Sequence, residues 1–212
     1  MSAQVITIAQ QKGGSGKTTL AVCLATELLA RGKCVGLLDT DPQGSLGKWF
    51  MTRCEKYGED ENLRFSTATS WGVSYELRSL GKPCDVIIVD TPPKADSDLR
   101  PALREADLLL VPVSASHVDV WATQDVLEMA GRVKKDAHIV QNRTRAGTRL
   151  GVEVSEVLKE FDAKVLSTTL GNRVIFAETL GQGLGVGDAR RNAAAVREVT
   201  ALVDEVVALL WH

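Results

Sequence analysis

Short apolar runs alternate with longer segments of helical spacing along the chain of 212 residues. The runs are rich in Val, Ile and Leu and show no polar alternation, which is typical of strands buried on both faces of a parallel sheet. We therefore expect strands at residues 5–9, 35–38, 86–89, 108–113 and 137–142, and residues 63–67 fit an edge strand. Between them, helices are expected at residues 20–30, which are rich in strong helix formers, and at the polar, aromatic-bearing residues 45–57. Further helices are expected at residues 71–80, 119–133 and 152–161, and at residues 193–210, where apolar residues recur at helical spacing.

The alternation of strands and helices predicts the fold class. Strands that alternate with helices form an α/β fold in which helices cover both faces of a mainly parallel, twisted sheet. No linker or break in composition divides the chain, and its length is sufficient to bury one sizeable core. We expect a single three-layer domain that spans residues 1–212.

A glycine-rich segment separates the first predicted strand from the first predicted helix. Residues 11–19 have the sequence Gln-Lys-Gly-Gly-Ser-Gly-Lys-Thr-Thr. In such a turn, glycines let the backbone approach an anion, and the N–H groups and the positive end of the helix point toward it. Lys17 can neutralise the β- and γ-phosphates, and the Thr18 hydroxyl can ligate Mg²⁺. The segment predicts a phosphate-binding loop with nucleotide contacts from Gly13, Gly14, Ser15, Gly16, Lys17, Thr18 and Thr19.

The loop departs from the general pattern G-x-x-x-x-G-K-[ST] at one position. Gln11 stands where that pattern has its first glycine, and a second lysine, Lys12, follows it. On these residues the chain resembles the ParA/MinD family of deviant Walker A ATPases, and in particular its small ParA-type partition proteins. The resemblance implies a P-loop NTPase fold in which Lys12 reaches across a dimer interface to the ATP of the partner subunit. From the residues alone, Lys12 is equally compatible with a solvated surface lysine.

Polar residues follow several of the predicted strands. Asp39 and Asp41 follow the second strand, Asp90 follows the third strongly apolar strand, and Asn142 ends a later one. Because ligands of open α/β sheets bind beyond the carboxyl ends of the strands, these residues and the glycine loop predict one composite site. Asp90 matches a Walker B aspartate, which holds Mg²⁺ usually through water. Each of these residues is, taken singly, also an ordinary turn former.

The family resemblance assigns roles to these residues. It implies that Asp41 positions and activates the attacking water, that Asp39 supports the metal shell and that Asn142 lies beside the adenine. The reaction implied is hydrolysis of the β,γ bond of a nucleoside triphosphate, with Lys17, Mg²⁺ and the loop amides stabilising the transferred phosphoryl group. ATP is expected rather than GTP, because the chain has no N/T-K-x-D motif to read guanine.

Composition limits the class of protein. The formal net charge of -2 shows no overall basic bias, so any contact with nucleic acid requires a local patch. Four cysteines are scattered without a C-x-x-C pair and only three histidines occur, which argues against a zinc site and fits a reducing cytoplasm. Two of the cysteines lie in apolar runs and are expected in the core. Trp49, Trp71 and Trp121 are also expected in the core, and a surface that binds a partner is the alternative for them. No secretion signal or run of the ~20 apolar residues needed to span a membrane occurs, which predicts a cytoplasmic protein.

The last predicted helix bears on whether the protein binds membrane or DNA. Its polar face carries Glu198, Asp204 and Glu205, whereas a helix that binds an anionic membrane carries Lys and Arg there. We therefore expect no membrane partner. The helix is expected to pack on the domain through Val196, Val199, Leu202, Val203, Val206, Leu209 and Leu210.

Arginines cluster in two later segments. Arg143, Arg145 and Arg149 lie in a dense basic loop, and Arg173 lies in a segment that resembles the region where ParA proteins carry a DNA-binding arginine. Such residues would contact DNA phosphates without reading the sequence, and binding would depend on salt. The alternative interpretation is a solvated basic surface.

The resemblance implies a weak ATPase that dimerises on ATP, binds DNA nonspecifically and is associated with the nucleoid. It also implies an activating partner, ParB-like or centromere-binding, and a cargo that is a plasmid or chromosome locus. One alternative is that the same switch positions a protein cluster such as chemoreceptors. A MinD-like membrane-associated ATPase and a metabolic P-loop enzyme remain further alternatives.

Overall fold

The computed structural model describes residues 3–93, 96–145, 147–189 and 191–211. Within these residues, one seven-stranded sheet has the order β3-β2-β4-β1-β5-β6-β7, and all of its paired strands run parallel. The predicted parallel sheet and the edge strand at residues 63–67 are confirmed. The strands are β1 (Gln4–Ile8), β2 (Val35–Asp39), β3 (Leu63–Thr67), β4 (Val86–Asp90), β5 (Leu108–Ser114), β6 (Ala137–Asn142) and β7 (Lys164–Val165).

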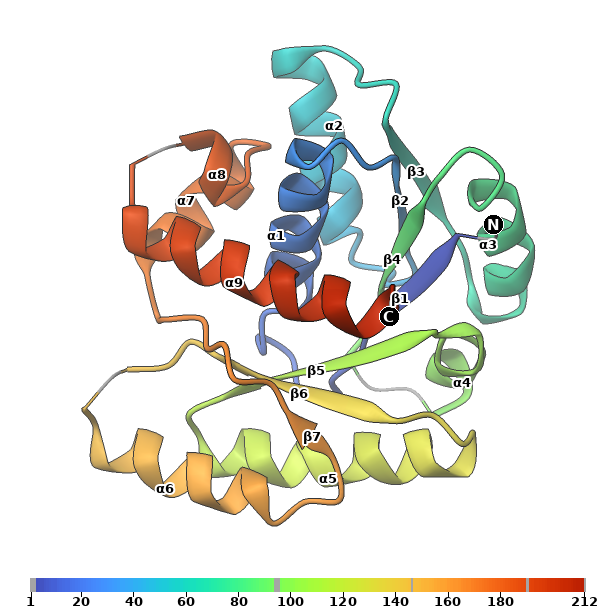
Figure 1. Cartoon of the computed structure of the whole chain (residues 1–212). Helices are drawn as coiled ribbons and strands as arrows, with labels where there is room; N and C mark the ends of the chain where they lie inside the picture. The colour runs from blue at the N-terminus through green and yellow to red at the C-terminus, as the bar shows by residue number, and fades with distance from the viewer. Residues whose placement is uncertain (1–2, 94–95, 146, 190, 212) are drawn as a thin grey trace.

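Helices cover both faces of this sheet, which gives the expected three-layer α/β arrangement (Figure 1). One face packs against α1 (Lys17–Ala30), α2 (Ser45–Tyr57), α7 (Val174–Gly181), α8 (Val186–Ala189) and α9 (Ala193–Leu210). The other face packs against α3 (Val73–Leu80), α4 (Asp96–Glu105), α5 (His117–Arg132) and α6 (Arg149–Lys159), and the short 3₁₀ helix η1 (Ser70–Gly72) precedes α3.

Strand β4 shows why the apolar runs are continuous rather than alternating. Val86 and Ile88 belong to the core on the α1 side of the sheet, whereas Ile87 and Val89 belong to the core on the α3 side. Successive side chains of a strand point to opposite faces, so a strand covered on both faces is apolar at every position. This burial fixes the carboxyl end of β4, where Asp90 lies.

The last helix packs on the domain, as predicted. In α9, Val199, Leu202, Val203 and Val206 are buried in the same core as α1. None of the helices in the described part of the chain has the length and apolar character needed to cross a membrane.

Four elements were not predicted. Helix α4 is polar and contains Pro101, which disfavours a helix interior. Strand β7 has two residues, and α7 and α8 are short, so none has enough periodicity to detect. Several helix starts also differ: α1 begins at Lys17, because its first turn continues directly from the glycine loop, and α6 begins at Arg149.

Burial was predicted wrongly for two tryptophans. Trp49 on α2 is 2% exposed, whereas Trp71 is 88% exposed and Trp121 is 69% exposed. Trp71 lies in η1, outside any regular apolar face, and Trp121 lies on α5 one position beyond its buried residue Val120. These side chains were expected in the core because they are large and apolar. Their exposure instead depends on the position of each residue in its helix.

Candidate functional site

The site lies where the carboxyl ends of the central strands meet. Asp39 and Asp90 are the last residues of β2 and β4, and they are paired in register on these neighbouring strands. The glycine loop follows β1, which pairs with β4 on its other side. Asn142 ends β6, two strands further along the sheet. The structure thus brings together the four polar signals predicted to share one edge.

Glycines are required at specific points of the loop. Gly14 and Gly16 have φ values of 81° and 92°, a left-handed conformation that favours glycine. A Cβ atom on Gly16 would lie 2.3 Å from Nδ2 of Asn142. That nitrogen donates a hydrogen bond to the carbonyl oxygen of Ser15 at 2.9 Å, so the end of β6 holds the loop in place.

Asn142 uses both ends of its side-chain amide within the chain. Its Oδ1 accepts a hydrogen bond from the N–H of Arg143 at 2.9 Å, in addition to the bond from Nδ2 to Ser15. Arg143 itself has a φ of 51°, which is uncommon for a residue with a side chain. Asn142 therefore positions the phosphate loop, and its expected place beside an adenine stays a prediction.

Lys17 lies in the first turn of α1 and is buried. Its Nζ donates a hydrogen bond to the carbonyl oxygen of Gln10 at 3.0 Å. Burial lowers the pKa of Lys17 from its usual value, and the negative charges of Asp90 and Asp41 oppose that change. An amine held in this way at the start of a helix is suited to neutralise a phosphate, because an anion there would compensate the buried charge.

Thr18 and Asp90 form the part of the site suited to a metal ion. The Thr18 hydroxyl donates a hydrogen bond to Oδ2 of Asp90 at 2.6 Å. Asp90 is 1% exposed, and burial raises the pKa of its carboxyl to about 7, although the hydrogen bond from Thr18 acts in the opposite direction. Oδ1 of Asp90 is buried without a hydrogen-bond partner. A carboxylate oxygen without a partner beside a threonine hydroxyl fits the oxygen ligands or bound waters of Mg²⁺.

The loop after β2 is held by Asp39. Its Oδ1 accepts a hydrogen bond from the N–H of Asp41, and its Oδ2 accepts one from the N–H of Gly47, both at 3.0 Å. Burial raises the pKa of Asp39, and these backbone hydrogen bonds oppose the rise. Both oxygens thus orient the loop that carries Asp41, whose own Oδ1 accepts from the N–H of Gln43 at 2.9 Å.

Lys12 contacts a different part of the molecule from Lys17. Its Nζ forms an ion pair with Oδ1 of Asp119, a buried residue in the first turn of α5. Oδ2 of Asp119 accepts a hydrogen bond from the N–H of Ser114 at 3.2 Å. The side chain of Lys12 is about one-third exposed, so this ion pair lies at the surface end of the site. The two lysines of one loop therefore have separate partners.

The roles of Asp119 and Gln10 were not predicted from the sequence. Gln10 is fully buried, and its Nε2 donates to Oγ1 of Thr123 on α5 at 3.1 Å, which anchors the start of the loop. Asp119 lies shortly after the carboxyl end of β5, the same kind of position that pointed to Asp39 and Asp90. The position of Asp119 after a strand could have indicated a site residue, whereas the sequence around Gln10 gives no such indication.

The four arginines occupy adjoining segments. The N–H of Thr144 donates to the carbonyl oxygen of Leu170 at 2.9 Å, and Thr144 forms an isolated bridge with Gly171, so the loop after β6 lies beside the segment before α7. Residue 146 of the basic loop lies outside the described residues. Charge on this surface is partly compensated by two ion pairs, Arg149 with Glu153 at 2.7 Å and Arg173 with Glu198 at 2.5 Å.

A cavity of about 850 Å³ adjoins the loop that carries Asp39 and Asp41. Its lining includes Trp71 and Tyr75, and both side chains are largely exposed. These two exposed aromatic residues therefore border the loop that carries Asp39 and Asp41.

The chain is similar to proteins that share this arrangement. The family model described as the CobQ/CobB/MinD/ParA nucleotide binding domain matches residues 6–186. A maintenance of carboxysome distribution protein A from Halothiobacillus neapolitanus is 28% identical over 209 residues, which is 95% of each chain. The chromosome-partitioning ATPase Soj of Thermus thermophilus is 26% identical over 236 residues, which covers 96% of this chain and 95% of that protein.

A solved structure extends this similarity to the fold. A plasmid partition protein of Borrelia burgdorferi B31 with bound AMPPNP superposes with a TM-score of 0.77 at 21% identity, covering 97% of this chain and 99% of that one. The family model alone matches well over half of the chain. The chain therefore belongs to the CobQ/CobB/MinD/ParA nucleotide-binding family and is an ATPase of the ParA/MinD type.

Proposed function

We propose that this ATPase dimerises on ATP, binds DNA nonspecifically as the dimer and positions a cargo, with hydrolysis resetting the cycle. The observation that carries the proposal is that the two lysines of the glycine loop contact different partners. Lys17 is buried against the loop's own backbone, whereas Lys12 pairs with a carboxylate at the surface end of the site.

The geometry at the loop supports the proposed nucleotide roles. Lys17 and the N–H groups at the start of α1 would bind the phosphates, and Asp41 would orient the attacking water. Thr18 and Asp90 would hold Mg²⁺, and Asp39 would support this group by fixing the loop that carries Asp41. When bound, Mg²⁺ supplies positive charge to the phosphate oxygens as negative charge develops on them.

The position of Lys12 supports the proposed dimer. In this structure, the lysine forms an ion pair with Asp119. ATP bound in a second subunit offers it a more negative partner, so Lys12 leaves Asp119 only when two chains meet around nucleotide. Assembly thereby becomes conditional on ATP.

The DNA-binding surface is the junction between the loop after β6 and the segment before α7. Arg143 and Arg145 are exposed on this junction, and Thr144 joins it to the second segment, which carries Arg173. Asn142 connects the same loop to the phosphate loop through Ser15. A structural change at the bound nucleotide can therefore be transmitted to the basic surface through Asn142.

The relatives suggest two classes of cargo. The Soj protein and the Borrelia burgdorferi protein are named for chromosome and plasmid partition, which supports a DNA locus as cargo. The Halothiobacillus neapolitanus relative is named for carboxysome distribution, which supports a protein assembly instead. In either case we expect an activating partner, ParB-like or centromere-binding for a DNA cargo, and association with the nucleoid in the cytoplasm.

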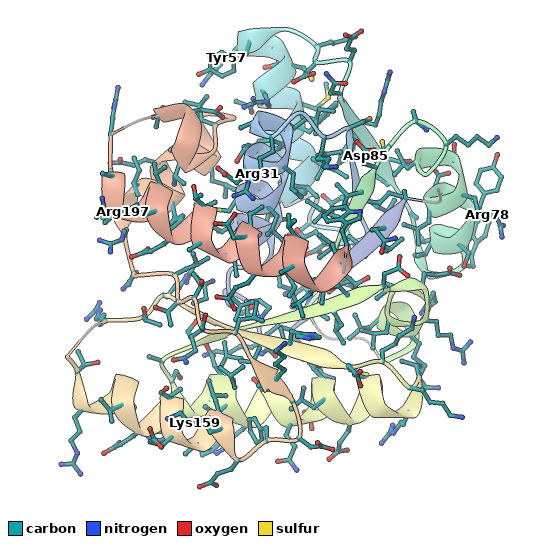
Figure 2. The ribbon with its side chains drawn as sticks, in the orientation of Figure 1. Arg31, Tyr57, Arg78, Asp85, Lys159 and Arg197 are labelled. Atoms are coloured by element: carbon teal, nitrogen blue, oxygen red, sulfur yellow. The ribbon has the colours of Figure 1, made fainter. Side chains whose placement is uncertain are left out.

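DNA binding by the ATP dimer tests this proposal. Asp41→Ala should trap the dimer with ATP, and a gel-shift or anisotropy titration should show binding to DNA of any sequence that weakens steeply with salt. Arg145→Ala in that background should lower the slope of log affinity against log salt by about one unit. Arg78→Ala is the matched control, because Arg78 is exposed on α3, away from the β6–α6 loop (Figure 2).

Two results would contradict the DNA proposal. One is an ATP dimer that fails to bind DNA or binds it without salt dependence. The other is an equal loss of affinity in the Arg145→Ala and Arg78→Ala variants. Turnover raised by a small acceptor molecule rather than by DNA and a partner would instead support a metabolic P-loop enzyme.

A further inference from the structure

Two cysteines lie together at the amino ends of two neighbouring strands, at the opposite end of these strands from the nucleotide site. Cys34 directly precedes β2, and Cys84 is separated from β4 by one residue, Asp85. These strands are neighbours, and the N–H groups of Asp85 and Val86 donate to the carbonyl oxygen of Cys34 at 2.9 and 3.3 Å. The side chain of Asp85, labelled in Figure 2, adds a further hydrogen bond, because its Oδ2 accepts from the N–H of Cys34 at 2.8 Å. The backbone around the two cysteines is therefore tightly paired.

The two sulfur atoms are in contact. The Sγ–Sγ distance is 3.4 Å, and the Cys34 thiol donates to the sulfur of Cys84. A disulfide requires neighbouring backbones and Cβ atoms that face each other, with the sulfurs about 2.05 Å apart. Adjacent strand ends meet the first condition and the sulfur contact meets the second, so small side-chain rotations suffice to form the bond.

The sulfur of Cys84 lies close to the backbone of β2. A Cβ on Gly36, the nearest glycine of β2, would lie 3.4 Å from the Cys84 sulfur. Glycine at position 36 therefore lets the sulfur of Cys84 pack against the backbone of β2.

The two thiols differ in access. Cys84 is buried, and burial raises the pKa of its thiol to about 12, with the neighbouring Cys34 adding to the rise. Cys34 is only partly buried. An oxidant in solution therefore meets Cys34 first, and Cys84 is held in contact as the second thiol.

We propose that Cys34 and Cys84 form a reversible intramolecular disulfide when the protein meets a hydroperoxide. The Cys34 thiolate attacks the peroxide oxygen, which breaks the O–O bond and gives a sulfenic acid and an alcohol or water. The Cys84 thiol then attacks the Cys34 sulfur, the S–O bond breaks, and water leaves with the Cys84 proton. Two thiols are oxidised and one peroxide is reduced, and a dithiol reductant reverses the change.

The disulfide links the far ends of the two strands that carry Asp39 and Asp90. Because the sulfurs already touch, the bond tightens the existing pairing of β2 and β4 and leaves the nucleotide loop in place. Linking residues 34 and 84 also restricts the unfolded chain, so the oxidised protein should unfold at a higher temperature.

Peptide mapping tests the proposal. The protein is treated with hydrogen peroxide, alkylated and digested without reductant, and we expect one linked peptide pair that contains Cys34 and Cys84 and disappears with dithiothreitol. The Tm should rise on oxidation of the wild-type protein and not of the Cys34→Ser variant. Cys54→Ser is the matched control, because Cys54 lies on α2 outside this contact, and it should retain the linked peptides.

The Cys84→Ser variant gives a second readout. Without its partner thiol, Cys34 should accumulate as sulfenic acid, which dimedone labels. Oxidation of the wild-type protein only to sulfinic or sulfonic acids, a linkage that includes Cys54, or a disulfide between chains would overturn the proposal.

Discussion

Asp90 illustrates how a single buried charge serves the nucleotide site at a cost to stability. Its carboxylate is 1% exposed, one oxygen accepts from Thr18, and the other has no hydrogen-bond partner. Its pKa is raised from 3.8 to about 7, so the folded chain binds this proton more tightly than the unfolded chain does. The ionised group therefore destabilises the nucleotide-free fold, and a bound cation would offset that cost.

Asp90→Asn should separate stability from function. The amide keeps an acceptor for Thr18 but carries no charge, so the nucleotide-free variant should be more stable than the wild type by about 4 kcal/mol, or roughly 8–16 °C in Tm. The gain should be full above pH 7 and shrink toward pH 4, because Asp90 of the folded wild type is protonated as the pH falls. Thermal unfolding across this pH range measures it.

The same variant should lose the dependence of ATP binding on Mg²⁺. Calorimetric titration with and without Mg²⁺ provides that measurement. Thr7→Ser, which keeps the buried hydroxyl that donates to the carbonyl oxygen of Ala102, serves as a control. A less stable Asp90→Asn protein at pH 8 would contradict this description of Asp90.

Lys12 and Asp119 should be coupled in the nucleotide-free chain. Lys12→Ala leaves a buried carboxylate without its ion pair and should lower the free energy of unfolding by about 1–2 kcal/mol, a value reduced because Lys12 is partly exposed. Asp119→Asn in the same background should recover most of the loss, because the amide can still accept from Ser114. Urea unfolding of the four proteins in a double-mutant cycle measures the coupling, and strictly additive losses would exclude it.

Helix α2 shows that an element can contribute both core and surface. Trp49 is buried between α2 and the sheet, and its Nε1 donates to the carbonyl oxygen of Leu184 at 3.2 Å, which ties α2 to the segment before α8. Arg53, one turn later, donates to the carbonyl oxygen of Gly183 at 3.1 Å and pairs with Asp188 at 2.9 Å. One face of this helix therefore holds the chain's C-terminal elements against the sheet.

The paired tryptophan variants test this assignment. Trp49→Ala should lower the free energy of unfolding by about 3–5 kcal/mol, because it leaves a large cavity and removes the donor to the carbonyl oxygen of Leu184. Trp71→Ala should change it by less than about 0.5 kcal/mol, because Trp71 is 88% exposed. Chemical denaturation of both variants distinguishes the positions, and equal losses would show that the burial assignment is wrong.

The elements that could be predicted are those with strong periodicity. The helix at residues 45–57 and the tail helix at residues 193–210 were predicted with their observed bounds, because both have clear apolar faces and defined ends. Helix α4 could not be found, since Pro101 and its polar residues hide the pattern. The exposure of Trp121 could not be found either, because it depends on how α5 rotates against the sheet.

The residues of the candidate site could largely be predicted, but the contacts among them could not. The motif at residues 11–19 and the aspartates after the strands follow from local sequence. The pairing of Lys12 with Asp119, the anchoring of the loop by Gln10 and the contact of Asn142 with Ser15 depend on strand order. The order β4-β1-β5-β6 brings these residues together, and no local pattern encodes it.

At the level of the assembly, the central claim is that each active site needs residues of two chains. If Lys12 acts on the partner's nucleotide, a Lys12→Ala chain still has an intact Asp41, and an Asp41→Ala chain still has an intact Lys12. Each variant alone should be inactive, because every site in its homodimer lacks one of the two groups. In a mixed dimer, the nucleotide bound to the Lys12→Ala chain meets both groups.

The most direct measurement is therefore ATP hydrolysis by an equimolar mixture of Lys12→Ala and Asp41→Ala proteins, compared with each protein alone. Random pairing of the chains in a symmetric dimer should restore about one quarter of the wild-type rate, because half of the dimers are mixed and each has one complete site. A mixture as inactive as its components, under conditions where mixed dimers form, would contradict a site shared between two chains.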